Sequence, residues 1–383
     1  MKKMKEKIGI FLAIALACIF GAGIGWLMAD YADYNAEINR TGASVGETLF
    51  QAAKPLIIAY VWIGVQTIIH EAGHLVFGLL TGYHFSSFRI GSFMWVKREG
   101  RIRFARYSLA GTGGQCLLAP PDMQDGRFPY VLYHMGGSLM NLLSAVLAGG
   151  IAALCHSMGA ETAGKSFVIA AAIGAVYALI NGIPMRLGTI DNDGYNACAT
   201  GKNPGALRAN WLQLKVNEQM TAGVRLKDMP EAWFAMPADE EMKNGMTAVV
   251  GVFACNRLMD EKRFAEADRE MERLLSMDTG IVGLHRSLMK GDRIFCELLG
   301  EGRKERIDKL RDKEQRKVAK AMKKFPAVLR TEYAYALLEE KDGEKAGKIR
   351  EEFEKMAEKY PYPCDIEAER ELMETADSCS REG

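Results

Sequence analysis

The sequence predicts a membrane α-helical protein with two domains: four transmembrane helices with a small β element, followed by a soluble all-α domain. Two observations support this prediction. Long apolar runs fill the first half of the 383 residues. Charged residues make up 25% of the whole chain, and most of them stand in the second half. A single core rarely grows beyond about 250–300 residues. We therefore expect a transmembrane domain over residues 1–200 and a helical domain over residues 201–383.

Four apolar segments are long enough to cross a bilayer, which takes about 20 residues of helix. They cover residues 8–28, 55–82, 130–154 and 166–188. The first segment follows a basic start, so a cleaved signal peptide is the competing interpretation. The apolar region of such a peptide would be shorter, about 7–15 residues. The uncharged run from Ile8 to Met28 therefore favours a retained helix.

The loops between the spans differ in charge, and this difference predicts the orientation. The loop before the third span is rich in arginine and lysine, whereas the loop before the second span has more acidic than basic residues. Basic loops stay on the cytosolic side, so with four spans both termini and the second half are expected in the cytosol. Residues 85–120 of the basic loop are expected to form the β element, cytosolic or re-entrant, with a hairpin turn at Arg98-Glu99-Gly100-Arg101.

Composition excludes two further classes of site. The net charge of +1 gives no support for nucleic-acid binding, which needs a basic face. The eight cysteines form no CxxC pair, so a zinc knuckle or a thioredoxin-like motif is not available. The lipid bilayer is the partner that the apolar segments predict.

The pattern His70-Glu71-Ala72-Gly73-His74 stands in the second span. Residues four apart lie on one face of a helix, so both imidazoles can point at one metal ion. Zinc is the usual metal for such a pair, and Glu71 can take a proton from a metal-bound water. Gly73 keeps the helix surface low between the ligands, which would let substrate backbone approach. A polar patch that joins helices is the alternative, but three ionisable groups in a membrane helix favour a functional site.

A catalytic zinc takes three protein ligands, so a third ligand is expected elsewhere. The end of the fourth span is the best candidate, because Pro184 breaks the helix there and lets the chain turn back towards the depth of His70. Two carboxylates follow this break, Asp191 and Asp193. Both remain candidates at this point.

The combination of these elements resembles the site-2 protease family of intramembrane zinc metalloproteases, over residues 60–196. The family carries HExxH in one core helix and an Asn/Pro segment with Asp-Gly in a later one. The resemblance implies that His70 and His74 are zinc ligands, with Glu71 as the general base. Because Gly194 follows Asp193, it also implies Asp193 as the third ligand. The gap from Pro184 to the Asp-Gly pair is longer than in the family, so Asp191 stays an alternative.

The segment from Gly136 to Asn141 is similar to another element of that family, with glycine in place of a proline. By this resemblance Asn141 would position the scissile carbonyl or its oxyanion by hydrogen bonding. A structural asparagine that bonds a neighbouring helix is the alternative.

The function expected from this resemblance is hydrolysis of peptide bonds in or near transmembrane segments of membrane-anchored proteins. The resemblance and the short basic start suggest a bacterial cytoplasmic membrane. A catalytically silent scaffold that holds client helices is the competing hypothesis. A transporter is disfavoured, because the membrane half has four spans and no evident internal repeat.

The second half predicts helical pairs similar to tetratricopeptide repeats, over residues 251–274 and 333–361. The two pairs are not a whole number of 34-residue repeats apart, so generic helical hairpins remain the alternative. A surface of this kind would bind a cytosolic protein partner.

Overall fold

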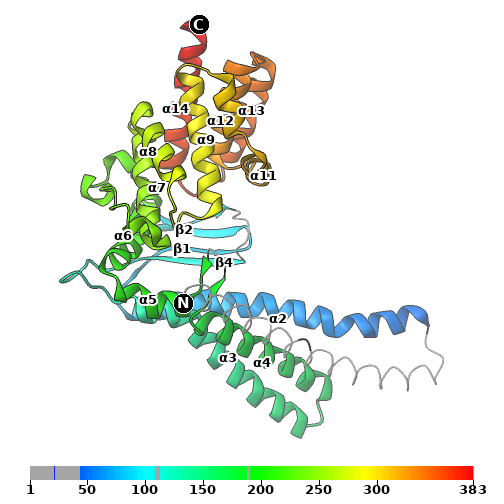
Figure 1. Ribbon diagram of the computed structural model, residues 1–383. Helices are drawn as coiled ribbons and strands as arrows, with labels where there is room; N and C mark the ends of the chain where they lie inside the picture. The colour runs from blue at the N-terminus through cyan, green and yellow to red at the C-terminus, as the bar shows by residue number, and fades with distance from the viewer. Residues whose placement is uncertain (1–20, 22–43, 108–112, 188–189, 383) are drawn as a thin grey trace. The chain divides into compact units, whose positions relative to one another are not determined.

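The structure is a computed structural model that describes residues 21, 44–107, 113–187 and 190–382 (Figure 1). Apart from Gly21, the expected first span at residues 8–28 lies outside these described residues. The chain divides into two compact units. The first comprises the chain up to Tyr83 together with Pro129–Lys202, and the second comprises His84–Phe128 together with Asn203–Gly383.

Three helices of the first unit are long and apolar enough to cross a membrane: α2 (Val45–Leu80), α3 (Val131–Ser157) and α4 (Glu161–Gly182). The stretch of α2 that meets this description is Ala53–Leu80. Helices α3 and α4 run side by side, and α2 packs against both (Figure 1). The protein is therefore mostly helical, and its described part has three candidate membrane helices.

The packing of α3 follows its sequence. Small residues occupy much of its buried side, including Gly137, Ala145, Ala148 and Ala152. Small side chains let helix backbones approach closely in a membrane, where the hydrophobic effect does not drive helix association. The large apolar residues of α3, such as Leu142, Leu143 and Val146, are exposed on the outside. This distribution is the one expected of a helix whose outer surface faces lipid.

The last candidate membrane helix ends earlier than the sequence analysis expected. Residues 166–188 were expected to be helical, but α4 spans Glu161–Gly182. Ile183 is extended because the residue before a proline is driven out of the helical conformation. The chain then forms a small hairpin from β5 (Arg186–Leu187) and β6 (Ile190–Asp191). The short helix α5 (Asp193–Ala199) and a 3-10 turn (Thr200–Lys202) complete the unit.

The second unit contains an antiparallel sheet of four strands in the order β3-β2-β1-β4. The strands are β1 (His84–Ile90), β2 (Phe93–Arg98), β3 (Arg101–Arg106) and β4 (Gly114–Ala119). The predicted hairpin turn is confirmed: Arg98 pairs with Arg101, and Glu99 and Gly100 between them both have positive φ. Two such residues are typical of the turns that join twisted strands.

The helices of the second unit follow one another as packed pairs. Helix α8 packs on α7 and α9, and α12 packs on α9, α13 and α14. The helices are α6 (Pro204–Thr221), α7 (Gly245–Asp260), α8 (Phe264–Ser276), α9 (Gly283–Leu299), α10 (Lys304–Leu310), α11 (Lys313–Ala321), α12 (Pro326–Ala334), α13 (Gly343–Ala357) and α14 (Pro363–Glu382). Short 3-10 turns at Leu226–Asp228, Glu231–Phe234 and Glu241–Lys243 lie between α6 and α7, and a π-helical turn at Tyr335–Glu339 follows α12.

The sheet belongs to the second unit, whereas the sequence analysis grouped residues 85–120 with the membrane domain. One face of the sheet buries Met94, Val96 and Ala105 in the same core as the C-terminal helices. The Arg98 guanidinium donates hydrogen bonds to the carbonyl oxygens of Tyr360 and Pro361. These contacts join segments more than 260 residues apart in the chain, which sequence proximity alone would not suggest.

Candidate metal centre

Helix α2 brings the two histidines of the HExxH pattern together. The Nε2 atoms of His70 and His74 lie 3.2 Å apart, one helical turn from each other along α2. Both side chains are buried, with 8% of each residue exposed, and Glu71 between them is equally buried. The structure thus places all three ionisable residues of the pattern in the interior of the helix bundle.

Asp193 completes the group from the first turn of α5. Its Oδ2 atom lies 3.1 Å from His70 Nε2 and 3.4 Å from His74 Nε2. Among the described residues, this is the one group of three histidine, cysteine or acidic side chains close enough to share a metal ion. Asp191 is not a member of this group. Its backbone pairs with that of Arg186 between β5 and β6. That hairpin takes up the longer gap between Pro184 and Asp193.

Asn192 holds Asp193 in place by joining the end of α4 to the start of α5. Its side-chain oxygen caps α5 by accepting from the Tyr195 N–H (2.9 Å) and also accepts from the Met185 N–H (3.0 Å). Its Nδ2 donates to the carbonyl oxygens of Ile180 (2.6 Å) and Ile183 (2.7 Å). Asparagine is a preferred residue at this capping position. The carbonyl groups that the broken helix would otherwise leave unpaired are therefore bonded beside the candidate ligand.

The spacing of the three atoms fits a tetrahedral zinc ion. Zinc bonds of about 2.0–2.2 Å to nitrogen and oxygen, directed to the corners of a tetrahedron, place neighbouring ligand atoms about 3.3–3.5 Å apart. The observed separations of 3.1, 3.2 and 3.4 Å are close to these values. Two imidazoles and one carboxylate also leave the fourth position for water or substrate, as catalytic zinc sites do.

The second ring nitrogen of each histidine, Nδ1, lies within hydrogen-bond distance of an oxygen atom. His74 Nδ1 donates a hydrogen bond to the backbone carbonyl oxygen of Tyr133 at 2.7 Å. His70 Nδ1 lies 2.8 Å from the side-chain oxygen of Asn141. Metal-binding histidines commonly have such a partner, which orients the ring.

The side chain of Asn141 contacts one neighbouring helix, α2. The residue is fully buried, and its Nδ2 donates to both the backbone oxygen and the side-chain oxygen of Gln66 on α2. Of the two roles that the sequence left open, bonding a neighbouring helix is the one that these contacts display. The expected contact with a scissile carbonyl finds no support in them, because the side chain lies behind His70.

Gly73 is also used differently from the expectation. It was expected to leave room for substrate, but the backbone of α3 occupies that space. A β-carbon on Gly73 would collide with the Gly136 carbonyl group, and one on Gly137 would lie 2.5 Å from His70 Cε1. The glycines on both helices let α2 and α3 approach closely, and the His70 ring lies against Gly137.

Gln66 belongs to the site but was missed by the sequence analysis. It is fully buried, one turn before His70 on α2, and its Nε2 donates to Ser144 Oγ (3.0 Å) and to the Ala170 carbonyl oxygen (3.3 Å). The available signal was an amide side chain inside an otherwise apolar span. Such a residue needs hydrogen-bond partners wherever it is buried.

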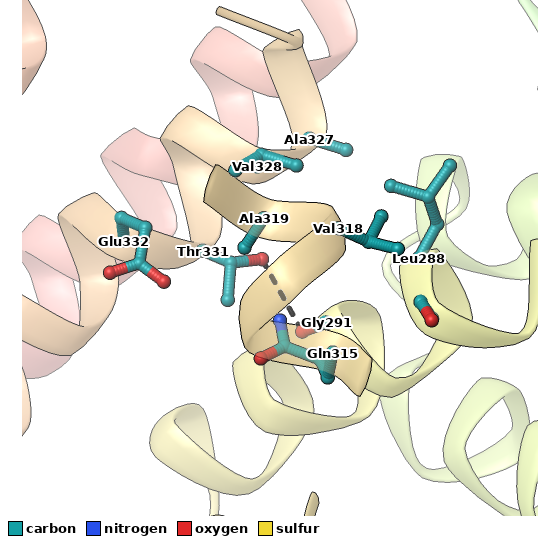
Figure 2. Close-up of a pocket in the computed structure, with 10 residues that line it drawn as sticks. Leu288, Gly291, Gln315, Val318, Ala319, Ala327, Val328, Thr331 and Glu332 are labelled. Carbon is teal, nitrogen blue, oxygen red and sulfur yellow. Dashed lines mark hydrogen bonds between the residues drawn. The ribbon is translucent and has the colours of Figure 1, made fainter. Parts of the chain in front are cut away.

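A small pocket in the second unit lies among α9, α11 and α12 (Figure 2). In this view Gln315 points towards Gly291, and Thr331 Oγ1 donates to the Gly291 carbonyl oxygen at 3.3 Å. The remaining lining is largely apolar, from residues that include Leu288, Val318 and Val328. None of the residues that the sequence predicted for the site lines this pocket.

Comparison of the chain with models of known protein families, with curated proteins and with solved structures finds no match.

Proposed function

We propose that this chain is a zinc-dependent intramembrane protease that resembles the site-2 protease family. The observation that supports it is the group of His70 Nε2, His74 Nε2 and Asp193 Oδ2, with separations of 3.1–3.4 Å, inside a bundle of helices suited to a membrane. An inert scaffold has no need of such a group, because buried ionisable side chains in a membrane are costly unless they are used.

The chemistry proposed is hydrolysis of a peptide bond in or near the transmembrane segment of a membrane-anchored protein. A zinc ion held by His70, His74 and Asp193 would lower the pKa of a water molecule and polarise the scissile carbonyl. Glu71, next to His70 on the same helix, would take the proton of that water and return it to the leaving amine. The two histidines and Asp193 stay in place through the bonds to Tyr133, Asn141 and Asn192 described above.

The arrangement in the membrane is also part of the proposal. We propose four spans, with the expected first span at residues 8–28 preceding the three described helices, both termini in the cytosol, and a bacterial cytoplasmic membrane. The first segment expected to be tetratricopeptide-like, residues 251–274, overlaps α7 and α8, and the second, residues 333–361, overlaps the end of α12, the π-helical turn and α13. We propose that they form a cytosolic surface for a protein partner.

The function can be tested with the full chain purified in detergent and a panel of synthetic single-span peptides. The apolar segments of the panel would carry a glycine, asparagine or proline that weakens their helix. We expect the zinc-loaded wild type to cleave members of the panel at a bond within or next to the apolar segment, as read by mass spectrometry. Glu71→Gln should retain zinc and form no product. Equal cleavage by Glu71→Gln, or no cleavage by a zinc-loaded wild type, would contradict the proposal.

A further inference from the structure

A line of buried amide side chains runs behind His70 and connects all three candidate membrane helices. Asn141 on α3 contacts His70 and Gln66 on α2, and Gln66 contacts Ser144 on α3 and Ala170 on α4. Asn141 and Gln66 are both fully buried. A polar group buried in a helix bundle costs free energy unless it is hydrogen-bonded, so the orientation of each amide is constrained by its partners.

The orientation of the Asn141 amide follows from one backbone atom. The carbonyl oxygen of Gln66 lies 3.0 Å from Asn141 Nδ2, and a carbonyl oxygen can only accept a hydrogen bond. The NH₂ group of Asn141 must therefore face Gln66. Its side-chain oxygen then faces His70, at 2.8 Å from Nδ1.

The position of the His70 proton follows from that orientation. The side-chain oxygen of Asn141 only accepts hydrogen bonds, so Nδ1 of His70 must be the donor. An imidazole that binds a metal ion is neutral and carries one N–H, which leaves the lone pair on Nε2. That nitrogen is the one that lies 3.1 Å from Asp193 and 3.2 Å from His74. The lone pair needed for a metal bond therefore points into the candidate metal centre.

The orientation of the Gln66 amide group, at the other end of this line, is determined in the same way. The carbonyl oxygen of Ala170, 3.3 Å from Gln66 Nε2, requires the Gln66 NH₂ group to face α4. The side-chain oxygen of Gln66 then accepts the second N–H of Asn141, at 2.8 Å. The backbone carbonyl oxygens of Gln66 and Ala170 thus determine the orientation of both amide groups. Rotating either amide by 180° would place an N–H against His70 or an oxygen against a carbonyl oxygen.

We infer that Asn141 and Gln66 are positioning residues that hold His70 in the Nδ1–H tautomer, with Nε2 presented as a metal ligand. The inference rests on the metal-binding part of the proposed function and is independent of peptide cleavage. Asn141 then supports metal binding by orienting His70 and not by contacting substrate. Gln66 supports it indirectly, by orienting Asn141.

The experiment measures zinc affinity in the full chain purified in detergent, by competition with a chelator of known affinity. Asn141→Leu removes the acceptor for Nδ1–H, and we expect it to weaken zinc binding by about 10–100-fold, as loss of such partners commonly does. Asn141→Asp keeps an acceptor but loses the donor to Gln66. We expect it to lower the melting temperature while zinc affinity stays within a few fold of the wild type.

A matched control removes a similar bond elsewhere. Ser166→Ala breaks the hydrogen bond from Trp62 Nε1 to Ser166 Oγ (3.0 Å), which also joins α2 and α4 but does not contact His70. We expect unchanged zinc affinity there, and Gln66→Leu should weaken zinc binding less than Asn141→Leu does. In addition, the ¹⁵N chemical shifts of His70 in the zinc-loaded wild type should show a protonated Nδ1 and a metal-bound Nε2.

The outcomes separate this inference from the proposed function. Wild-type zinc affinity in Asn141→Leu, or zinc bound to His70 through Nδ1, would overturn the inference. The inference would also be overturned if the decrease in zinc affinity were proportional to the decrease in melting temperature in all four variants, because a purely structural role predicts that relationship. A wild type that binds no zinc would instead overturn the proposed function itself.

Discussion

Gly73 on α2 and Gly136 on α3 pack backbone against backbone. A β-carbon on Gly136 would lie 2.5 Å from the Gly73 carbonyl oxygen, and a β-carbon on Gly73 would meet the Gly136 carbonyl group in return. This contact sets the distance between the two helices one residue before His74. The carbonyl oxygen that holds the His74 ring, from Tyr133, lies three residues before Gly136 on α3. The separation of α2 and α3 therefore controls the geometry of the candidate metal centre.

We expect Gly73→Ala to weaken zinc binding and to lower stability. The added methyl group has no space, and overpacking of this kind typically costs about 1–3 kcal/mol. Helices pushed apart would also move Tyr133 away from His74. Zinc affinity and melting temperature in detergent would measure both effects. Gly64→Ala is the matched control on the same helix, because a β-carbon there meets nothing within 4 Å. If Gly73→Ala and Gly64→Ala gave the same melting temperature, the close contact would have no structural importance.

The ligand set predicts different results for two nearby carboxylates. We expect Asp193→Ala to lose bound zinc, because its Oδ2 lies within 3.4 Å of both histidine Nε2 atoms. Asp191→Ala should retain about one zinc per chain, because Asp191 lies in the β5–β6 hairpin. Elemental analysis of the detergent-purified variants, beside the wild type and His70→Ala, would check this. Loss of zinc from Asp191→Ala alone would reverse the assignment.

The second unit should lose stability as the pH rises towards neutrality, because of Asp365. Removal from water, reinforced by the neighbouring Glu369 carboxylate, raises the pKa of Asp365 to about 7 from its ordinary value of 3.8. Between these two values the folded state holds a proton that the unfolded state has released. Stability therefore falls as the pH rises through this window and stays reduced above it.

We expect Asp365→Asn to raise the melting temperature at pH 8 by more than at pH 5, because asparagine does not ionise. Thermal unfolding of the full chain in detergent at both values would measure the difference. Asp377, whose carboxylate bonds the Arg350 guanidinium (2.6 Å), offers a contrasting position on α14. Asp377→Asn should lower the melting temperature at pH 8, because it removes the partner of a charged group. An equal shift at both pH values for Asp365→Asn would contradict the prediction.

The sequence predicted the local parts of the candidate site well. The spacing of His70 and His74 is sufficient to predict that both side chains lie on one face of a helix, because residues four apart share a face whatever surrounds them. Asp193 was reached through the resemblance and the glycine that follows it. The structure gives that glycine a reason: a β-carbon on Gly194 would collide with the Gly182 carbonyl group at the end of α4.

The tertiary parts of the site could not be predicted in this way. Nothing in the spacing of Gln66 and Asn141 indicates that they meet, because they lie on different helices, 75 residues apart. The buried position of Asn141 depends on how α3 packs against α2, so its role stayed open. The same limit applies to the sheet: the sequence predicted the hairpin turn between β2 and β3, but not the core that Met94 and Val96 join.

The division of the chain has a practical consequence for the design of soluble fragments. The sheet stands in the sequence between two candidate membrane helices but belongs with the C-terminal helices. The chain therefore passes between the units three times, at residues 83–84, 128–129 and 202–203. A fragment cut at Asn203 would lack Met94, Val96 and Ala105 and would expose the apolar side chains that they cover. Expression of residues 84–128 fused through a flexible linker to residues 203–383 would retain that core, and it is the form in which partners of the second unit should be sought.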